Sequence, residues 1–421
     1  MHLELLTVGT ELLLGFTVDT NSAEIGRRAA AVGVRVVRRT SVGDAGSEIA
    51  EGVAAALARS GAVLTTGGLG PTSDDVTKTA VCERLGLALR FDEATWARLV
   101  ERFARLGRTP SPANRSQAMV PDGATVLPNR WGTAPGLWLE GAWGLVIMLP
   151  GVPLEMRMLL EHEVVPRLAA RTGERVVRSR VVRTAGIPES TLADRLGDVE
   201  TVVAPATLAY LPGIEGVDLR LTAWQLPAAE ADAVLARGER VLLERAREYA
   251  YGVGDSSLAE VVVNALRAAR RRVAVGESCT GGLLAGRITD VAGSSEVFDG
   301  GVVAYANEVK QRDLGVAGAL LEAHGAVSEP VAAAMADGVR ARFGVEFGLA
   351  VTGIAGPGGG SPAKPVGTVW FAVAGPDGTT THHAVLPGTR PEVRARAAQT
   401  ALLLLWRRLG AAHGADIGLP V

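Results

Sequence analysis

The sequence predicts an α/β protein of three domains, and three observations carry this prediction. The chain has 421 residues, about three times the ~150 residues of a typical domain. Near both ends, short apolar runs alternate with segments of helical periodicity, the pattern of a parallel sheet covered by helices. A smaller region between them reads strand, helix, strand, strand, helix. We therefore expect an α/β domain over residues 1–171, a small α+β domain over 172–250 and an α/β domain over 251–421.

The first domain contains apolar runs that predict buried strands, at residues 3–8, 34–37, 62–65 and 145–149. Helices are expected from about Asp19, from about Ser47 and, after Pro150-Gly151, up to about Arg171. In the middle region, residues 217–224 alternate apolar and polar side chains, as a half-buried strand does. The last domain opens with a helix that Asp255 or Ser256 is expected to cap.

Composition excludes several classes of protein. The longest apolar stretch, residues 137–149, is interrupted by Glu140 and falls short of the ~20 residues that span a membrane. Glu4 lies within the first apolar run, so we expect no secretory signal. Cys82 and Cys279 are the only cysteines, which predicts no disulfide framework or thiolate metal cage and fits a cytoplasmic protein. A net charge of −2 predicts no nucleic-acid partner.

Lysine is scarce in this chain. Of 43 basic residues only Lys78, Lys310 and Lys364 are lysines, so surface charge is carried almost entirely by arginine. Each of these lysines is a candidate for a role that needs a compact ammonium or a neutral amine, which guanidinium cannot supply. Chance placement of a few lysines in polar loops is the alternative.

A strand-to-helix corner in the last domain presents a candidate nucleophile. Residues 272–282 run from a strand into a turn and then a helix beginning near Gly281, with Ser278 at the corner. Backbone N–H groups of such a turn point at whatever binds there, as an acyl-transfer site requires. Thr280 replaces the second glycine of the usual nucleophile elbow. From these residues alone, a phosphate cradle or a simple helix cap remains open.

The candidate base for Ser278 is a lysine. His324, His382, His383 and His413 lie in segments that read as surface helix, strand or tail. A second strand-to-helix junction instead places Tyr305, Asn307 and Lys310 together. Burial or a nearby positive charge could lower the pKa of Lys310 from ~10.4 and make it a base, with Tyr305 relaying the proton. A phosphate-binding lysine beside a packed tyrosine is the alternative.

A third strand of this domain ends in Thr352-Gly353 and opens into the glycine-rich stretch Gly356–Gly360, with Lys364 at its exit. Glycines allow the backbone to approach a ligand and to bind an anion or an amide through N–H groups. A plain flexible loop is the other interpretation, against which the polar entry and the scarce lysine argue.

These motifs resemble, in order, those of the nicotinamide mononucleotide deamidase domain of CinA proteins. The resemblance is carried by Glu277-Ser-Cys-Thr-Gly-Gly282, Tyr305-Ala-Asn-Glu-Val-Lys310, Gly325-Ala-Val-Ser-Glu329, Thr352-Gly-Ile-Ala-Gly-Pro357 and Lys364-Pro-Val-Gly367. It implies cofactor-free hydrolysis of nicotinamide mononucleotide to nicotinic acid mononucleotide and ammonia, a step of the pyridine nucleotide cycle of NAD salvage. The implied catalytic residues are Ser278, Tyr305 and Lys310. The implied substrate-binding residues are Glu277, Thr280, Gly281, Gly282, Asn307, Thr352, Gly353, Gly356 and Lys364.

A glycine-rich loop follows a buried strand in the first domain. Residues 65–75 precede a helix that carries Lys78 and include Asp74 and Asp75. Glycines admit a phosphate, a helix N-terminus favours an anion, and two carboxylates could hold a hard divalent cation. Simple complementarity between two acids and the helix dipole is the alternative.

This loop resembles that of molybdopterin-binding-type domains, and the resemblance extends to about Met156. It also rests on Gly9-Thr-Glu-Leu-Leu-Leu-Gly15, Asp19-Thr-Asn21, Asn114-Arg-Ser-Gln117, Gly132-Thr-Ala-Pro-Gly136 and Leu149-Pro-Gly-Val-Pro153. It implies an α/β/α sandwich with metal-dependent ADP-ribose pyrophosphatase activity and Asp74 and Asp75 at the metal. The implied nucleotide-binding residues are Thr10, Glu11, Asn21, Gly67, Gly68, Gly70, Asp74, Lys78, Asn114, Gly136 and Gly151.

The middle region resembles the KH-like domain of the same family. Gly213-Ile-Glu-Gly216 has the G-x-x-G form that clamps nucleic-acid backbones. In this chain it lies between two expected strands and carries an acid, so we predict a hairpin turn. The family resemblance also implies a homodimer. Two other interpretations remain open, namely a single-activity deamidase with a non-catalytic nucleotide-binding domain and a non-enzymatic competence or recombination partner.

Overall fold

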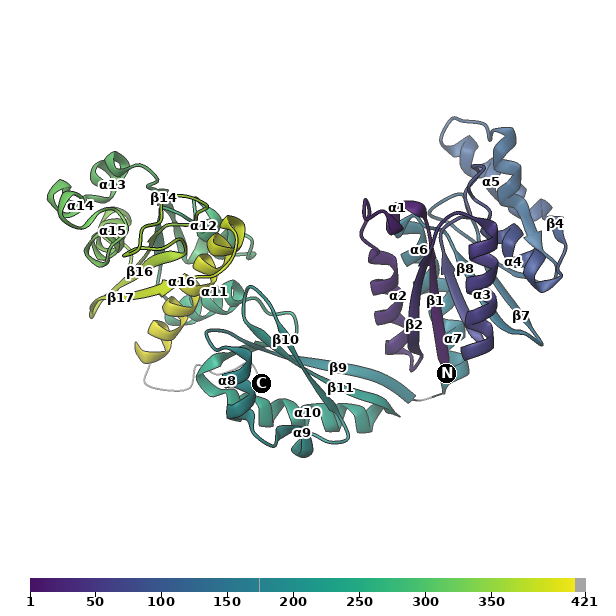
Figure 1. Ribbon diagram of the computed structural model, residues 1–421, viewed down its shortest axis with the longest axis horizontal. Helices are drawn as coiled ribbons and strands as arrows, with labels where there is room; N and C mark the ends of the chain where they lie inside the picture. The colour runs from purple at the N-terminus through teal and green to yellow at the C-terminus, as the bar shows by residue number, and fades with distance from the viewer. Residues whose placement is uncertain (174, 413–421) are drawn as a thin grey trace. The chain divides into compact units, whose positions relative to one another are not determined.

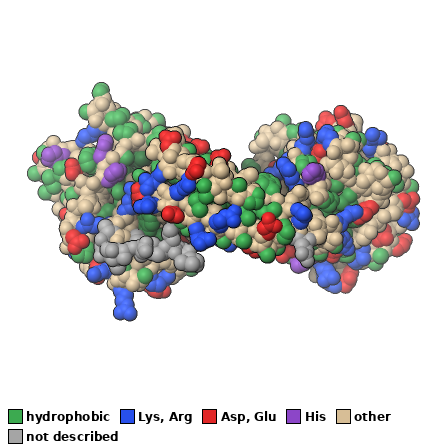
Figure 2. Space-filling view, turned by 90° about the horizontal axis from the view of Figure 1, so that it is seen from below, with side chains coloured by type: hydrophobic (Ala, Val, Ile, Leu, Met, Phe, Trp, Pro, Cys, Tyr) green, Lys and Arg blue, Asp and Glu red, His purple; other side chains and the backbone are tan. Residues whose placement is uncertain are grey.

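The computed structural model describes residues 1–173 and 175–412, so His413 lies outside the described residues. The chain divides into two compact units, residues 1–178 with 222–234 and residues 179–221 with 235–421, and each is described by itself (Figure 1). Among the described residues, no helix combines the length and the apolarity needed to cross a membrane. On the face shown in Figure 2, basic and acidic side chains are interspersed.

The first domain is an α/β/α sandwich, as predicted. Its six-stranded sheet has the order β2-β1-β3-β8-β7-β6, in which β2, β1, β3 and β8 are parallel. The apolar runs form the strands because both faces of the sheet are covered: Ile25 and Leu159 pack on one face, and Ile49 and Val81 on the other. The strands are β1 His2–Val8, β2 Arg35–Val42, β3 Ala62–Thr66, β6 Thr125–Leu127, β7 Gly136–Gly141 and β8 Gly144–Leu149.

The helices of this domain begin close to where the sequence places them. Asp19 caps α2 by accepting a hydrogen bond from the Ser22 N–H. The helices are α1 Thr10–Leu13, α2 Thr20–Ala31, α3 Gly46–Ser60, α4 Thr77–Leu85, α5 Glu93–Arg105, α6 Pro153–Leu159 and α7 Val165–Thr172, with a π-helical turn Leu160–Val164 between the last two. The 3₁₀ helix η1 Pro112–Ala118 leads into β5 Met119–Pro121, which pairs with β4 Leu89–Phe91.

The middle region is an α+β fold. Its sheet has the order β10-β11-β9-β12, with β9 Arg175–Thr184, β10 Thr207–Pro212, β11 Val217–Pro227 and β12 Ala250–Val253. Its helices are α8 Glu189–Leu196, α9 Val199–Val202 and α10 Ala228–Ala246, followed by the 3₁₀ turn η3 Arg247–Tyr249. Residues 213–216 join β10 to β11, and the Gly213 N–H donates to the Gly216 carbonyl at 2.8 Å. The predicted hairpin turn is therefore confirmed.

The last domain is a second three-layer α/β fold. Its sheet has the order β14-β13-β15-β16-β17, with β13 Val273–Glu277, β14 Phe298–Val303, β15 Phe347–Gly353, β16 Thr368–Gly375 and β17 Gly378–Val385. The helices α11 Leu258–Ala269, α12 Leu283–Thr289 and α16 Arg390–Ala412 cover one face, and α13 Asn307–Leu314, α14 Gly318–His324 and α15 Glu329–Phe343 cover the other. The 3₁₀ turn η4 Ser294–Glu296 precedes β14.

One expected cap in this domain is wrong. Ser257, rather than Asp255 or Ser256, caps α11, because its hydroxyl accepts from the Glu260 N–H while the Glu260 carboxylate accepts from the Ser257 N–H. The Ser256 hydroxyl instead donates to the carbonyl of Val253. Asp255, Ser256 and Ser257 are all of residue types that begin helices, but only Ser257 has a glutamate three positions later.

Candidate active sites

The motifs of the last domain meet at one edge of its sheet. Strands β13, β14 and β15 are parallel, and Glu277 pairs with both Val303 and Val351, so the three strands end at the same level. β13 lies between β14 and β15, which makes its carboxyl end the point where the chain changes direction across the sheet. Ligand crevices of open α/β sheets form at such points. The topology therefore brings Ser278, Lys310 and Thr352 together.

Ser278 and Lys310 are in direct contact. The Lys310 Nζ lies 3.1 Å from the Ser278 Oγ, 2.8 Å from the Ala304 carbonyl and 3.2 Å from the Tyr305 carbonyl. Ser278 is 8% exposed and Lys310 is 1% exposed. All three partners of the lysine nitrogen are uncharged, and burial lowers its pKa from the ordinary value of 10.5.

The hydrogen bonds of Lys310 are satisfied in both of its protonation states. As an ammonium it donates to all three oxygens. As a neutral amine it has two N–H groups, which the Ala304 and Tyr305 carbonyls accept because a carbonyl cannot donate. The lone pair is then left to the Ser278 hydroxyl. A proton can therefore pass between serine and lysine without any rearrangement of the side chains.

Cys279 is adjacent to Ser278 in the chain and offers a second nucleophile. Burial raises the pKa of its thiol to about 12. The thiolate is the reactive form of cysteine, so this group is inert at neutral pH. Of the two neighbouring nucleophiles, only Ser278 has a base in contact.

Glu277 organises the turn that carries Ser278. Its carboxylate is 1% exposed and accepts hydrogen bonds from the backbone N–H groups of Gly282 at 2.9 Å, Leu284 at 3.1 Å and Ala285 at 2.8 Å. It thus satisfies the free N–H groups at the start of α12. In the described residues, no acceptor is found for the backbone N–H groups of Cys279 and Thr280. These two donors remain free for a ligand oxygen.

Tyr305 accepts a hydrogen bond from Lys310 through its backbone carbonyl, whereas its side chain bonds Arg390. Its side chain is 59% exposed, and the phenol oxygen accepts from Arg390 at 2.8 Å. The second amino group of Arg390 donates to the Gly356 carbonyl at 2.7 Å, and Arg394 donates to the Thr280 carbonyl at 2.7 Å. The first turns of α16 therefore bring two cations to the site, which the sequence reasoning missed.

The remaining predicted substrate-binding residues divide into two groups. Gly281, Gly282, Thr352, Gly353 and Gly356 lie at the ends of the strands or in the turns that follow them. Asn307 is the exposed first residue of α13. Lys364 donates to the carbonyls of His324 and Val327, both at 2.8 Å, so it fixes the glycine-rich loop against α14. The Thr280 hydroxyl is buried and has no partner within the described parts of the chain.

A cavity of about 390 Å³ occupies the corresponding place in the first domain. β1 lies between β2 and β3, and the cavity begins at its carboxyl end with Val8 and Gly9. Gly67 and Gly68 form one wall, and a Cβ on either would overlap the Val8 carbonyl or the Thr77 hydroxyl, so these positions require glycine. The acidic side chains that line it are Glu11, Asp44, Asp74, Asp75 and Glu155.

The two predicted metal ligands have different surroundings. Asp75 accepts from the Gly70 N–H at 2.7 Å, the Thr72 N–H at 2.9 Å and the Thr72 hydroxyl at 2.5 Å, so its oxygens hold the glycine-rich loop in shape. Asp74 is exposed, and hydrogen bonding lowers the pKa of its carboxyl group. Among the described residues, no group of three or more acidic, histidine or cysteine side chains could hold a metal ion. A cation at this position would need ligands from the substrate or from water.

The cavity gathers only some of the predicted nucleotide-binding residues. Glu11, Gly67, Gly68, Gly70, Asp74 and Gly151 line it, and Asn21 lines an adjoining cavity of about 110 Å³. Four others do not line it and act in the framework. Lys78 donates to the carbonyls of Ser116 and Met119, Asn114 bonds within its own turn, Gly136 packs against Leu127 and Leu149, and Thr10 donates to Asp44.

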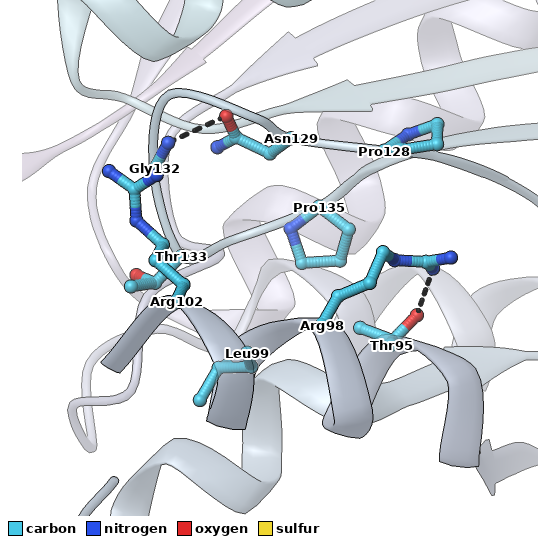
Figure 3. A pocket seen from close by; sticks show the side chains of 9 residues that line it. All are labelled: Thr95, Arg98, Leu99, Arg102, Pro128, Asn129, Gly132, Thr133 and Pro135. Carbon is cyan, nitrogen blue, oxygen red and sulfur yellow. Dashed lines mark hydrogen bonds between the residues drawn. The ribbon is translucent and has the colours of Figure 1, made fainter. Parts of the chain in front are cut away.

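Two acids of the cavity were missed by the sequence reasoning. Asp44 follows β2, and Glu155 lies in the first turn of α6. Glu155 accepts from the Asn129 amide at 2.5 Å, and burial raises the pKa of its carboxyl group. Figure 3 shows the neighbouring small pocket between α5 and residues 128–135, where Asn129 also accepts from the Gly132 N–H and Arg98 donates to Thr95.

Comparisons with known proteins agree with this architecture. Family models match a probable molybdopterin binding domain over residues 4–170, the KH domain of damage-inducible protein CinA over 179–252 and the CinA C-terminal domain over 255–409. A CinA-like protein of Gemmatimonas aurantiaca is 51% identical, covering 99% of this chain and 98% of the relative. One of Anaeromyxobacter dehalogenans is 44% identical, covering 96% and 99%. The crystal structure of CinA from Thermoplasma acidophilum is 38% identical, covering 38% of this chain and 94% of that one, with a TM-score of 0.36.

Fold, sites and matches together define a protein built from a molybdopterin-binding-type domain, a KH-like domain and a CinA C-terminal domain. The chain belongs to the CinA family of competence/damage-inducible proteins.

Proposed function

We propose that the last domain is an amidohydrolase that converts nicotinamide mononucleotide to nicotinic acid mononucleotide and ammonia. The observation that carries the proposal is the buried contact between the Ser278 hydroxyl and the Lys310 amine, 3.1 Å apart, with two carbonyls taking the other lysine hydrogens. A nucleophile with an adjacent base is the arrangement that acyl transfer requires. The identity of the substrate rests on the family resemblance.

The reaction begins when Lys310 takes the Ser278 proton and the serine oxygen bonds to the carboxamide carbon. The carbonyl oxygen becomes an oxyanion, which the free N–H groups of Cys279 and Thr280 are suited to stabilise. The C–N bond then breaks, and ammonia leaves with the proton from Lys310. A water molecule gives a proton to the lysine and attacks the ester carbon, and Ser278 recovers its proton as the carboxylic acid departs.

Arg390 and Arg394 suit an anionic substrate. Both guanidinium groups already bond protein carbonyls beside the nucleophile, so their charge is held at the site in the absence of ligand. Guanidinium forks bind phosphate well because they offer paired donors in a plane.

The test is ammonia release from nicotinamide mononucleotide by the purified chain and by Ser278→Ala and Lys310→Arg. We expect Ser278→Ala to abolish release. Lys310→Arg keeps the charge but cannot accept a proton usefully, so kcat should fall by ~10²–10⁴-fold. Because the neutral amine is the active form, wild-type kcat should decline as pH falls through the lowered pKa of Lys310. A raised KM with near-normal kcat in Lys310→Arg would make this residue a phosphate anchor.

We propose a second activity, metal-dependent cleavage of ADP-ribose to AMP and ribose 5-phosphate, for the first domain. The cavity of about 390 Å³ at the glycine-rich loop favours it, because its described lining holds five acids and neither lysine nor arginine. These acids repel a pyrophosphate, so it could enter the cavity only together with a cation that neutralises its negative charge. Oxygen donors such as Asp74 suit Mg²⁺.

Mg²⁺-dependent AMP release from ADP-ribose tests the second activity, and Ser278→Ala should leave it intact. Ammonia release without AMP release would favour a single-activity deamidase. Neither activity in folded protein would favour a non-enzymatic partner.

A further inference from the structure

A chain of hydrogen bonds, buried at its centre, leads to the cavity of the first domain. It begins at Ser111, passes through Asn114 and Gln117 of η1, and ends at Thr133 in the loop before β7. Asn114 is 7% exposed and Gln117 is completely buried. Gln117 and Thr133 both line the cavity that also contains the glycine-rich loop.

The direction of every hydrogen bond in this chain is determined. The Ser111 backbone N–H can only donate, so it fixes the Asn114 oxygen as its acceptor at 2.8 Å. The Asn114 amide then donates to the Gln117 oxygen at 3.0 Å, which leaves the Gln117 amide to donate to the Thr133 hydroxyl at 3.0 Å. Thr133 is therefore an acceptor toward the protein interior.

The proton of the Thr133 hydroxyl has no acceptor among the described residues. A hydroxyl that already accepts from Gln117 is complete only when it also donates. The acids around the cavity attract a cation, and the ligand oxygens that the cation leaves uncovered need hydrogen-bond donors.

We infer that Thr133 donates its hydroxyl proton to a phosphoryl oxygen of the ligand in this cavity. Gln117 is a positioning residue, because it keeps the hydroxyl turned outward as a donor. Lys78 supports Gln117 by bonding the carbonyls of Ser116 and Met119 on either side of it. This inference rests on the proposed pyrophosphatase function for the class of ligand, and its test is separate from turnover.

The experiment measures, by calorimetry on the full chain with Mg²⁺ present, the Kd of α,β-methylene ADP-ribose, an analogue that cannot be cleaved at the bridging atom. Thr133→Val removes the hydroxyl at nearly constant volume, and Thr133→Ser keeps it. A hydrogen bond to a charged oxygen corresponds to roughly a ten- to hundredfold change in Kd. We expect Thr133→Val to weaken binding by this factor and Thr133→Ser to bind within a few-fold of wild type.

Gln117→Glu tests the direction of these hydrogen bonds without removing the Thr133 hydroxyl. Its carboxylate would accept from both Asn114 and Thr133, so the Thr133 proton would turn inward, and binding should weaken as in Thr133→Val. If Gln117→Glu does not fold, as near-ultraviolet circular dichroism would reveal, the Thr133 pair alone decides.

A Kd for Thr133→Val within twofold of wild type would overturn the inference, whether or not ADP-ribose is cleaved. Binding that depends on Thr133 without any AMP release would instead overturn the pyrophosphatase proposal and leave the inference standing. If wild-type protein binds neither the analogue nor inorganic pyrophosphate with Mg²⁺, both are wrong.

Discussion

Replacing Glu277 with glutamine should loosen the turn that holds Ser278. The Glu277 Oε2 atom accepts from the Gly282 and Leu284 N–H groups, and Oε1 accepts from the Ala285 N–H. A glutamine at this position has one acceptor oxygen. With that oxygen in place of Oε2, its amide nitrogen would face the Ala285 N–H donor to donor, and the two surviving bonds would lose their charge.

The magnitude follows from this count. A hydrogen bond to a charged group contributes about 1.5–3 kcal/mol, and a buried donor left without a partner costs a similar amount. Water entering the turn would recover part of it, so we expect about 3 kcal/mol for opening of the turn. At 1.36 kcal/mol per tenfold change, the amides of Gly282, Leu284 and Ala285 should exchange with solvent on the order of 100 times faster.

Hydrogen exchange of peptides covering residues 277–289 measures this effect. Glu296→Gln is the matched control, because Glu296 is 61% exposed, pairs with Arg267 in the same domain and should change exchange little. We also expect kcat for deamidation to fall in Glu277→Gln, since the same turn positions Ser278. Unchanged exchange together with a raised KM for nicotinamide mononucleotide would refute the capping role and return Glu277 to the substrate-binding residues.

Two further predictions concern the first domain. Burial lowers the pKa of Lys78 from 10.5 to about 8. Between these pH values the unfolded chain binds more protons than the folded one, so the free energy of unfolding should rise with pH, by at most about 1.4 kcal/mol per pH unit. In urea unfolding Lys78→Met should lack this rise, and a pH dependence parallel to that of the wild type would contradict the lowered pKa of Lys78. Asp74→Asn should shift the Mg²⁺ dependence of AMP release to higher concentration, whereas Asp75→Asn should chiefly raise the KM for ADP-ribose because Asp75 holds the glycine-rich loop. In Mg²⁺ titrations of both variants, an unchanged Mg²⁺ dependence in Asp74→Asn would mean that Asp74 does not bind the cation, and an equal Mg²⁺ shift in Asp75→Asn would mean that Asp75 acts at the cation rather than through the loop.

The layers of both α/β domains could be predicted from the sequence because the information is local. Apolar runs such as residues 62–65 and 145–149 are short and flanked by helical periodicity, and they form β3 and β8. The position of Ser278 at a strand-to-helix corner is local in the same way. The 3.1 Å contact with Lys310 depends instead on the register of β13 with β14, in which Glu277 lies level with Val303. Register is set by tertiary packing.

The cationic side of the site around Ser278 could not be found from the sequence. Arg390 bonds the phenol of Tyr305, which lies 85 positions earlier in the chain, and nothing local marks it among so many arginines. The same holds for Glu155, which reads as an ordinary acid in the first turn of a helix. The scarcity of lysine did carry information. Of the three lysines, only Lys310 contacts the candidate nucleophile, whereas Lys78 and Lys364 hold backbone carbonyls of the framework.

All three lysines share one arrangement, in which the nitrogen donates to two backbone carbonyls. Acylating and methylating reagents consume free amines, and this chain offers them only the α-amino group and three nitrogens already engaged by the protein. Lys310 has the lowered pKa that favours the reactive neutral form, but at 1% exposure only a small reagent could reach it. Labelling with amine-directed reagents therefore reports on the surroundings of these three lysines. A ligand that covers Ser278 would be detected as protection of a single lysine, against almost no background from the arginine-rich surface.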